Sequence, residues 1–323
     1  CRMCGQWGRE GVTKKQGDQY IKTELAVDEL MSLIDDVAVF RPNITLFGGE
    51  PLLYGGCIEI IKYIKQRRMH CLIITNGFLL DDLAERIVDS GLDELNVSLD
   101  GGAELHDKIR GMSGLFDKIM KGLEKINYFK NKMHRKKPYI NLQCTITPDN
   151  YLRLEQLIQA ADEVDAASLT FHNLIFISHE LLIKQKKYDK MLDSSSLDWN
   201  GFIFEPGIKS DILEEKIKKI LSGKHRFSID FYPHFTSAEL KEYYNNPFYV
   251  PVDTRCRSPW IAAYIFPDGK VKPCLNSEYS YGNIKESRFT KLWNDEKAVR
   301  FRSLLKRDKF FPVCARCTEL YRY

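Results

Sequence analysis

The chain of 323 residues lacks the long apolar runs that membrane-spanning helices need. A span takes about 20 apolar residues, and the stretch around Asn173-Leu174-Ile175-Phe176-Ile177 is far too short. A surplus of one charge sign is also missing, because the net charge is only +4 and many Lys and Glu residues share it. We therefore expect no membrane partner and no nucleic-acid partner. Internal repeats and low-complexity segments are not found either.

No secretory leader is recognisable, so the nine cysteines do not predict a disulfide framework, and we expect a cytoplasmic protein. Because the chain begins with Cys1 instead of Met, we expect that an upstream segment is missing and do not exclude a targeting signal. Cys57, Cys71 and Cys144 fall within periodic segments and are predicted to be buried apolar residues. The other six cluster at the two ends: Cys1, Cys4, Cys256, Cys274, Cys314 and Cys317.

Short β-rich runs alternate with amphipathic helices through the first half of the sequence. Repeated alternation of this kind predicts right-handed crossovers and a parallel sheet, hence an α/β fold that is either open or curled into a barrel. The predicted strands are 44–47, 72–75, 95–99, 140–146 and 169–176.

Two predicted strands have one polar face each. Asn141, Gln143 and Thr145 alternate with apolar residues, as do Asn96, Ser98 and Asp100. A parallel strand covered on both faces should be nearly all apolar. The polar face therefore predicts a wet or ligand-filled interior, as in a partial (β/α)6 barrel that binds its ligand at the carboxyl ends of the strands.

Three domains are predicted from the change in pattern along the chain. Residues 1–177 form the partial barrel, and residues 178–250 form a connecting segment on the substrate side, with a possible strand at 227–232. Residues 251–323 form a small α+β domain, with a hairpin around Pro267-Asp268-Gly269 and a helix from Phe289 to about Leu305.

Polar residues with glycine follow three successive strands. The segments are Gly48-Gly49-Glu50-Pro51, Thr75-Asn76-Gly77 and Ser98-Leu99-Asp100-Gly101. Two glycines allow a ligand to approach the backbone closely, and Glu50 offers a carboxylate to a cationic group. Taken alone, the first segment could be a tight turn with an exposed Glu, but three such strand ends together indicate one ligand site.

Together with Cys1-Arg2-Met3-Cys4, these motifs resemble the radical S-adenosylmethionine (radical SAM) superfamily. Its members carry C-x-x-x-C-x-x-C after a first strand and a GGE-type motif after the second. Cys1 and Cys4 match the last two of those cysteines, so the third and the first strand are expected upstream of Cys1. The resemblance implies a 4Fe–4S cluster with one open iron, which S-adenosylmethionine chelates. The reduced cluster then cleaves S-adenosylmethionine to a 5′-deoxyadenosyl radical.

The resemblance also implies which residues bind S-adenosylmethionine. The Gly48–Pro51 segment holds its amino group through Glu50, and Ser98 and Asp100 reach its ribose or carboxylate. Met3 packs on the adenine, and Arg110 is either a carboxylate clamp or a solvated residue at a helix start. The predicted cofactor contacts are Met3, Gly48, Gly49, Glu50, Pro51, Thr75, Asn76, Ser98, Asp100 and Arg110.

The C-terminal cysteines, Cys256, Cys274, Cys314 and Cys317, could by spacing alone hold zinc. Their context resembles the SPASM/twitch extension of radical SAM enzymes, with Ser258-Pro259-Trp260, the hairpin and Tyr281-Gly282-Asn283-Ile284. A full SPASM domain holds two auxiliary clusters, whereas four ligands imply one auxiliary 4Fe–4S cluster here.

By strand parity, Gln143, Thr145, Thr170 and His172 are expected to face the interior, and Asp230 and His234 to lie near it. We predict catalytic roles for His172, Gln143 and Asp230, although His172 could also be a hydrogen-bonded core residue. The expected reaction is oxidative hydrogen abstraction from a peptide or small molecule, with a flavodoxin- or ferredoxin-type reductant. The alternatives are a redox-neutral epimerase or rearrangement enzyme and a non-catalytic zinc- or cluster-binding protein.

Overall fold

The computed structural model describes residues 4–8, 11–15 and 23–322, with no side-chain description at 14 and 15. The described residues pack as two compact units. Val37–Leu174 and Asp211–His234 form the first, called the sheet unit below. The described parts of Cys1–Asp36, Ile175–Ser210 and Phe235–Tyr323 form the second, called the auxiliary unit. The two units are defined by which residues pack together. They do not test the three domains predicted from the sequence, which remain a prediction.

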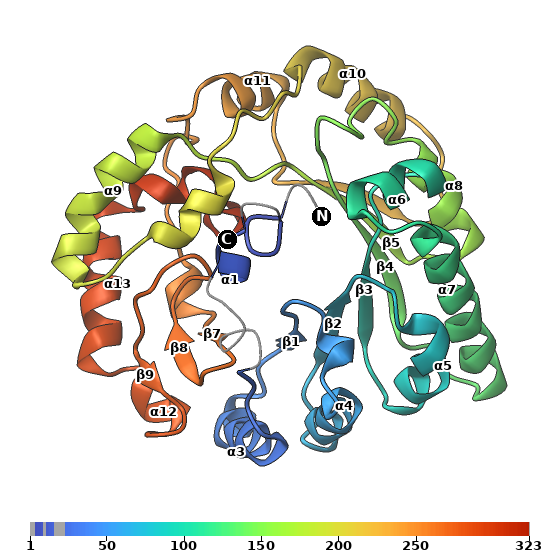
Figure 1. Ribbon diagram of the computed structural model, residues 1–323, viewed down its shortest axis with the longest axis horizontal. Helices are drawn as coiled ribbons and strands as arrows, with labels where there is room; N and C mark the ends of the chain where they lie inside the picture. Colours follow the sequence, from blue (N-terminus) through green and yellow to red (C-terminus); the bar gives the residue numbers. More distant parts are fainter. Residues whose placement is uncertain (1–3, 9–10, 16–22, 323) are drawn as a thin grey trace. The chain divides into compact units, whose positions relative to one another are not determined.

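A six-stranded parallel sheet is the centre of the sheet unit (Figure 1). Its strands pair in chain order: β1 (Ile44–Leu46), β2 (Cys71–Thr75), β3 (Glu94–Ser98), β4 (Tyr139–Thr145), β5 (Ser168–His172) and β6 (Ser228–Tyr232). The helices between them are α4 (Cys57–Gln66), α5 (Leu80–Asp89), α6 (Ala103–Arg110), α7 (Leu115–Lys132), α8 (Gln156–Glu163) and α10 (Ser210–Leu221). The short 3-10 helices η1 (Ala38–Phe40) and η2 (Pro51–Leu53) flank β1. The predicted α/β partial barrel is confirmed.

The two faces of the sheet differ as strand parity predicts. Helices α4, α5, α7 and α8 lie along its outer face in Figure 1. Toward them point fully buried apolar side chains, among them Ile73, Leu95, Leu142 and Phe171. The cysteines predicted as apolar residues, Cys57, Cys71 and Cys144, are all buried. The opposite face is half-exposed and polar on β3, β4 and β5, so it can line a wet interior.

Two sheet boundaries differ from expectation. The last predicted strand, 169–176, ends at His172, because Asn173 turns to donate its side-chain amide to the Pro233 carbonyl. The strand predicted at 227–232 belongs to the barrel instead of the connecting segment. It pairs in parallel with β5, since helix α10 provides the crossover.

The auxiliary unit contains a small antiparallel sheet, β7 (Tyr264–Ile265), β8 (Lys270–Lys272) and β9 (Gly282–Asn283). The predicted hairpin is confirmed in β7 and β8, where Gly269 has a φ of +89° that favours glycine. The predicted helix from Phe289 is split in two, because Asp295 caps a new helix by accepting a hydrogen bond from the Glu296 amide.

Most helices of the auxiliary unit are short, and two buried clusters hold parts of the unit together. The helices are α1 (Val12–Lys15), α3 (Val27–Val37), α9 (His179–Leu192), η3 (Leu197–Phe202), α11 (Ser237–Asn245), η4 (Ser258–Trp260), α12 (Phe289–Leu292), α13 (Glu296–Asp308), η5 (Pro312–Arg316) and η6 (Thr318–Tyr321). Aromatic residues fill one of these clusters, with Tyr279, Tyr281, Phe301 and Phe311 buried next to Cys256.

Candidate active site

Glu50 joins the carboxyl ends of β1 and β2. One carboxylate oxygen accepts hydrogen bonds from the Leu52 amide at 3.1 Å and the Thr75 hydroxyl at 2.7 Å. The other accepts from the Asn76 amide at 2.7 Å. Glu50 is therefore held by the two strand ends that carry predicted cofactor residues, and its orientation is fixed before any ligand binds.

The glycines before Glu50 leave open space. Gly48 and Gly49 are exposed, and a Cβ placed on Gly48 would meet no heavy atom within 4 Å. Pro51 follows as the first residue of η2 and directs the chain away from the strand end. A ligand group can thus approach the Gly48–Glu50 backbone, as the S-adenosylmethionine prediction requires.

Asp100 lies deeper than its position at a strand end suggests. Its side chain is fully buried, and one carboxylate oxygen accepts a hydrogen bond from Arg110 Nε at 2.6 Å. The other accepts from the Thr145 amide at 3.2 Å. This geometry makes Asp100 an anchor for Arg110, and its predicted contact with the cofactor stays a prediction, as does that of half-buried Ser98.

Two residues that the sequence reasoning missed support Asp100. His106 Nδ1 accepts a hydrogen bond from the Asp100 amide at 3.1 Å, and the Asn150 side chain donates one to the Asp100 carbonyl at 2.9 Å. Burial, and then the charge of Arg110, lowers the pKa of His106 to about 4, so its ring is neutral. The sequence signal for these two residues was a polar side chain in the segments that follow β3 and β4. Their hydrogen-bond partners, however, are set only by the fold.

The predicted catalytic residues form two side-chain pairs on the polar face. His172 Nε2 lies 2.5 Å from Gln143 Oε1, and the ring is 5.9 Å from that of Tyr232. Which of the two groups donates depends on the tautomer of His172. Asp230 pairs with His234 at 3.0 Å. The structure thus places all four residues in the sheet unit, near the carboxyl ends of β4, β5 and β6.

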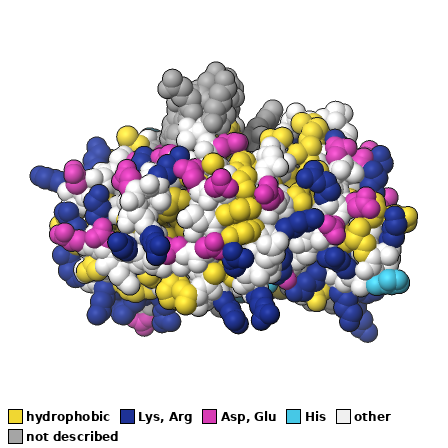
Figure 2. Space-filling view, turned by 90° about the horizontal axis from the view of Figure 1, so that it is seen from below, with side chains coloured by type: hydrophobic (Ala, Val, Ile, Leu, Met, Phe, Trp, Pro, Cys, Tyr) yellow, Lys and Arg dark blue, Asp and Glu magenta, His cyan; other side chains and the backbone are white. Residues whose placement is uncertain are grey.

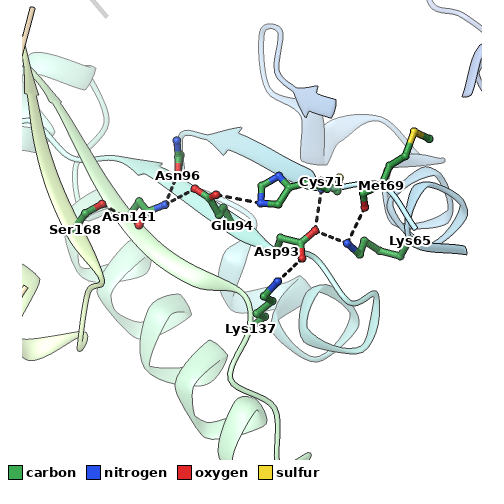
Figure 3. A network of polar contacts seen from close by, with 10 residues as sticks. Lys65, Met69, Cys71, Asp93, Glu94, Asn96, Lys137, Asn141 and Ser168 are labelled. Carbon is green, nitrogen blue, oxygen red and sulfur yellow. Dashed lines mark hydrogen bonds and ion pairs between the residues drawn. The ribbon is translucent and has the colours of Figure 1, made fainter. Parts of the chain in front are cut away.

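A separate polar network occupies the amino ends of the strands (Figure 3). Asn141 donates to Glu94 and to Asn96, both at 3.0 Å, and accepts from Ser168 at 2.8 Å. His70 Nε2 lies 3.1 Å from the second oxygen of Glu94. These polar groups satisfy one another, which explains how the face stays polar away from the predicted cofactor end.

The described part of the N-terminal cysteine motif begins at Cys4. The Trp7 amide donates to Cys4 Sγ at 3.2 Å, an interaction that stabilises a sulfur ligand. Gly5 lies against Phe202, and a Cβ there would be 2.4 Å from the ring, so a larger residue would require the Phe202 ring to move. Cys1 and Met3 lie outside the described residues.

The four C-terminal cysteines come together in the auxiliary unit. Burial raises the pKa of each thiol, to about 12 for Cys317. For Cys274, the next causes are the charges of Cys314, Cys317 and Cys256. All four are free of disulfides. A buried group of thiols that repel one another as thiolates is suited to a cationic iron core, which displaces their protons on binding.

Single-ion geometry is not found in the described part of the chain, where no three His, Cys, Asp or Glu side chains converge on one metal position. A 4Fe–4S cube has a different requirement, because each thiolate binds its own iron. The set of four buried thiols fits an iron–sulfur cluster.

Comparison with known proteins agrees with this chemistry. Residues 1–130 match the radical SAM superfamily, and residues 256–318 match the iron–sulfur cluster-binding domain called SPASM. The chain is a radical SAM protein with a SPASM domain. Its cofactors are accordingly S-adenosylmethionine and 4Fe–4S clusters, one set of cysteines lying in each matched region.

Known relatives of this radical SAM protein differ in their substrates. Fe-coproporphyrin III synthase of Methanosarcina barkeri is 27% identical and aligns with 94% of this chain and 75% of its own length. The structure of Streptococcus suis SuiB bound to precursor peptide SuiA aligns with 91% of this chain at 14% identity and a TM-score of 0.59. This chain spans 63% of SuiB. The structure of anSMEcpe with AdoMet and the Cp18Cys peptide has 19% identity and a TM-score of 0.56. The alignment covers 92% of this chain and 80% of anSMEcpe.

Two features of the described residues concern the predicted membrane and nucleic-acid interactions. No helix in the described ranges is long and apolar enough to cross a bilayer. Figure 2 shows Lys and Arg side chains intermixed with Asp and Glu over the face in view. The cytoplasmic location, the reductant and the absence of a nucleic-acid partner remain predictions.

Proposed function

We propose that this radical SAM protein oxidises its substrate by two electrons. When bound, S-adenosylmethionine and the N-terminal cluster supply a 5′-deoxyadenosyl radical that removes a hydrogen atom. The substrate must then lose one electron and one proton to become an oxidised product. The observation that carries the proposal is the burial of Cys256, Cys274, Cys314 and Cys317 as one thiol group, because four protein ligands leave no iron open for substrate and suit electron transfer.

The cofactor is proposed to bind at the carboxyl ends of β1, β2 and β3. The open backbone at Gly48 and Gly49 receives the methionyl group, and Glu50 orients it from a position fixed by Thr75 and Asn76. Arg110, anchored by Asp100, is proposed to bind a carboxylate. Cys1, Cys4 and an upstream cysteine are proposed to hold the radical-generating cluster.

The proton is proposed to leave through His172. The hydrogen bond to Gln143 orients the ring, and a neutral imidazole can accept a proton. Asp230, paired with His234, is proposed to orient substrate on the same polar face.

Peptide is the substrate class we favour, because the solved structures similar in fold include complexes with peptides. Similarity to Fe-coproporphyrin III synthase supports a tetrapyrrole as the second candidate. A redox-neutral epimerisation remains the alternative outcome.

The deciding experiment uses protein that has been reconstituted anaerobically with iron, sulfide and S-adenosylmethionine. Candidate peptides and iron coproporphyrin III are added separately, and the masses of the products are measured by mass spectrometry. Loss of two hydrogen atoms with stoichiometric 5′-deoxyadenosine supports oxidation. Unchanged substrate mass with incorporation of solvent deuterium would instead establish redox-neutral chemistry.

A further inference from the structure

Each polar atom of Asp100 has a hydrogen-bond partner within the sheet unit. The two carboxylate oxygens accept from Arg110 Nε at 2.6 Å and from the Thr145 amide at 3.2 Å. The backbone carbonyl accepts from the Asn150 side chain at 2.9 Å, and the backbone amide donates to His106 Nδ1 at 3.1 Å. Asp100 and His106 are both fully buried, so solvent does not reach this last hydrogen bond.

His106 contributes to this set through one ring nitrogen. A backbone amide can only donate, so Nδ1 carries the lone pair and the ring hydrogen lies on Nε2. Nε2 has no hydrogen-bond partner among the described residues, and the ring packs edge-on against Phe116 with ring centres 6.3 Å apart. An apolar ring would fill this place without burying an unpaired N–H group. Packing therefore does not explain the imidazole, whereas the acceptor at Nδ1 does.

The charges around His106 keep its ring neutral. The charged groups that face it are Arg110, Asp100 and Asp107. Burial, and then the charge of Arg110, lowers the pKa of His106 to about 4 against the opposing effect of the two carboxylates. A protonated ring would carry hydrogen on both nitrogens and could not accept from the Asp100 amide. The hydrogen bond is therefore present throughout the neutral pH range.

Two glycines separate Asp100 from helix α6. They are Gly101 and Gly102, and Gly102 is the N-cap residue of α6, where it supplies no side-chain cap. Glycine is the most permissive residue, so the turn alone does not fix Asp100 relative to the helix. His106 and Arg110 lie four residues apart on one face of α6. They hold Asp100 at its backbone amide and at its carboxylate, which fixes it against the helix.

We infer that His106 is a positioning residue for S-adenosylmethionine. By fixing Asp100 against α6, it sets the direction of the Arg110 guanidinium, which recognises a carboxylate through N–H groups in a rigid fork. His106 acts through these two residues and not by contact with the ligand, since its effect is to restrict Arg110 before binding. The inference rests on the carboxylate-binding role proposed for Arg110.

The test is calorimetric titration of reconstituted protein with S-adenosylmethionine. His106→Phe keeps a ring but removes the acceptor, and it should weaken binding about ten-fold. His106→Asn places an amide oxygen near the position of Nδ1, so its affinity should return to within about three-fold of wild type. The control is Asp93→Asn, which removes a buried carboxylate at the amino end of β3. It should bind like wild type, which separates positioning from a general loss of stability.

A double-mutant cycle decides how His106 acts. In an Arg110→Gln background, His106→Phe should cause no further loss of affinity, because its route to the ligand is gone. If Arg110→Gln weakens binding and the loss from His106→Phe adds to it in full, the inference is wrong while the proposed role of Arg110 stands. Normal binding by Arg110→Gln alone would refute that proposed role and, with it, the inference.

The wild-type protein provides a test if neither His106 variant folds. Histidines of ordinary pKa are mostly charged at about pH 5.5, whereas His106 should remain neutral with its hydrogen on Nε2 alone. Nitrogen-15 NMR of histidine-labelled protein distinguishes these ring forms. A spectrum at that pH without any neutral ring protonated on Nε2 would overturn the inference, because Nδ1 would then be unable to accept from Asp100.

Discussion

Asp93 offers a quantitative test of how the sheet unit is held together. Its buried carboxylate accepts hydrogen bonds from Lys65, from Lys137 at 2.7 Å and from the Cys71 amide at 2.9 Å (Figure 3). Burial opposes the charge, but these hydrogen bonds lower the pKa of Asp93 from 3.8 to about 2. At about 1.4 kcal/mol per pKa unit, the ionised form adds about 2 kcal/mol to the free energy of unfolding at neutral pH.

The sign of the pH dependence follows from the lowered pKa. Above the unfolded-state pKa of 3.8 the stabilisation is complete, and it is lost as the pH falls through the folded-state pKa of about 2. Asp93→Asn should therefore lower the free energy of unfolding by about 2 kcal/mol at pH 7, and by only about 1 kcal/mol at pH 3.

Urea unfolding of cluster-free protein, followed by circular dichroism at both pH values, measures this difference. All four tryptophans, Trp7, Trp199, Trp260 and Trp293, lie in the auxiliary unit, so tryptophan fluorescence reports that unit separately. The control is Asp89→Asn, which removes a half-exposed ion pair with Lys62 and should cost little. Equal effects of the two variants, or a difference that does not change with pH, would refute the reasoning.

Three further predictions concern the cofactor sites. Full-length protein reconstituted without oxygen should bind about eight irons as two 4Fe–4S clusters, and stoichiometric zinc on metal analysis would contradict this. Glu50→Gln should weaken S-adenosylmethionine binding by roughly 1.5–3 kcal/mol with unchanged iron content, measured by calorimetry against Glu59→Gln on α4 as control. Cys274→Ala should still form 5′-deoxyadenosine but lose oxidised product, and full product at the normal rate would exclude the electron-acceptor role.

Patterns that repeat within a few residues could be predicted from sequence. Alternation along 140–146 identified the polar face, and the structure confirms it because side-chain direction in a strand follows from position alone. The place of the Gly48–Pro51 segment directly after β1 could be predicted for the same reason, and its role in binding the cofactor stays a prediction. The strand at Ser228–Tyr232 was found, but its membership of the sheet was not, because pairing with β5 depends on a crossover some 55 residues long.

Partners that the fold brings together could not be predicted, and they change what a residue can do. From sequence, Asp100 and Arg110 were two separate ligand contacts, whereas the structure joins them as one buried ion pair. Removing Asp100 would therefore act on any bound carboxylate through Arg110, because the partly buried guanidinium would lose this ion pair. Arg316 shows the same limit. Its burial and its four hydrogen bonds to backbone carbonyls depend on segments that only the fold brings together.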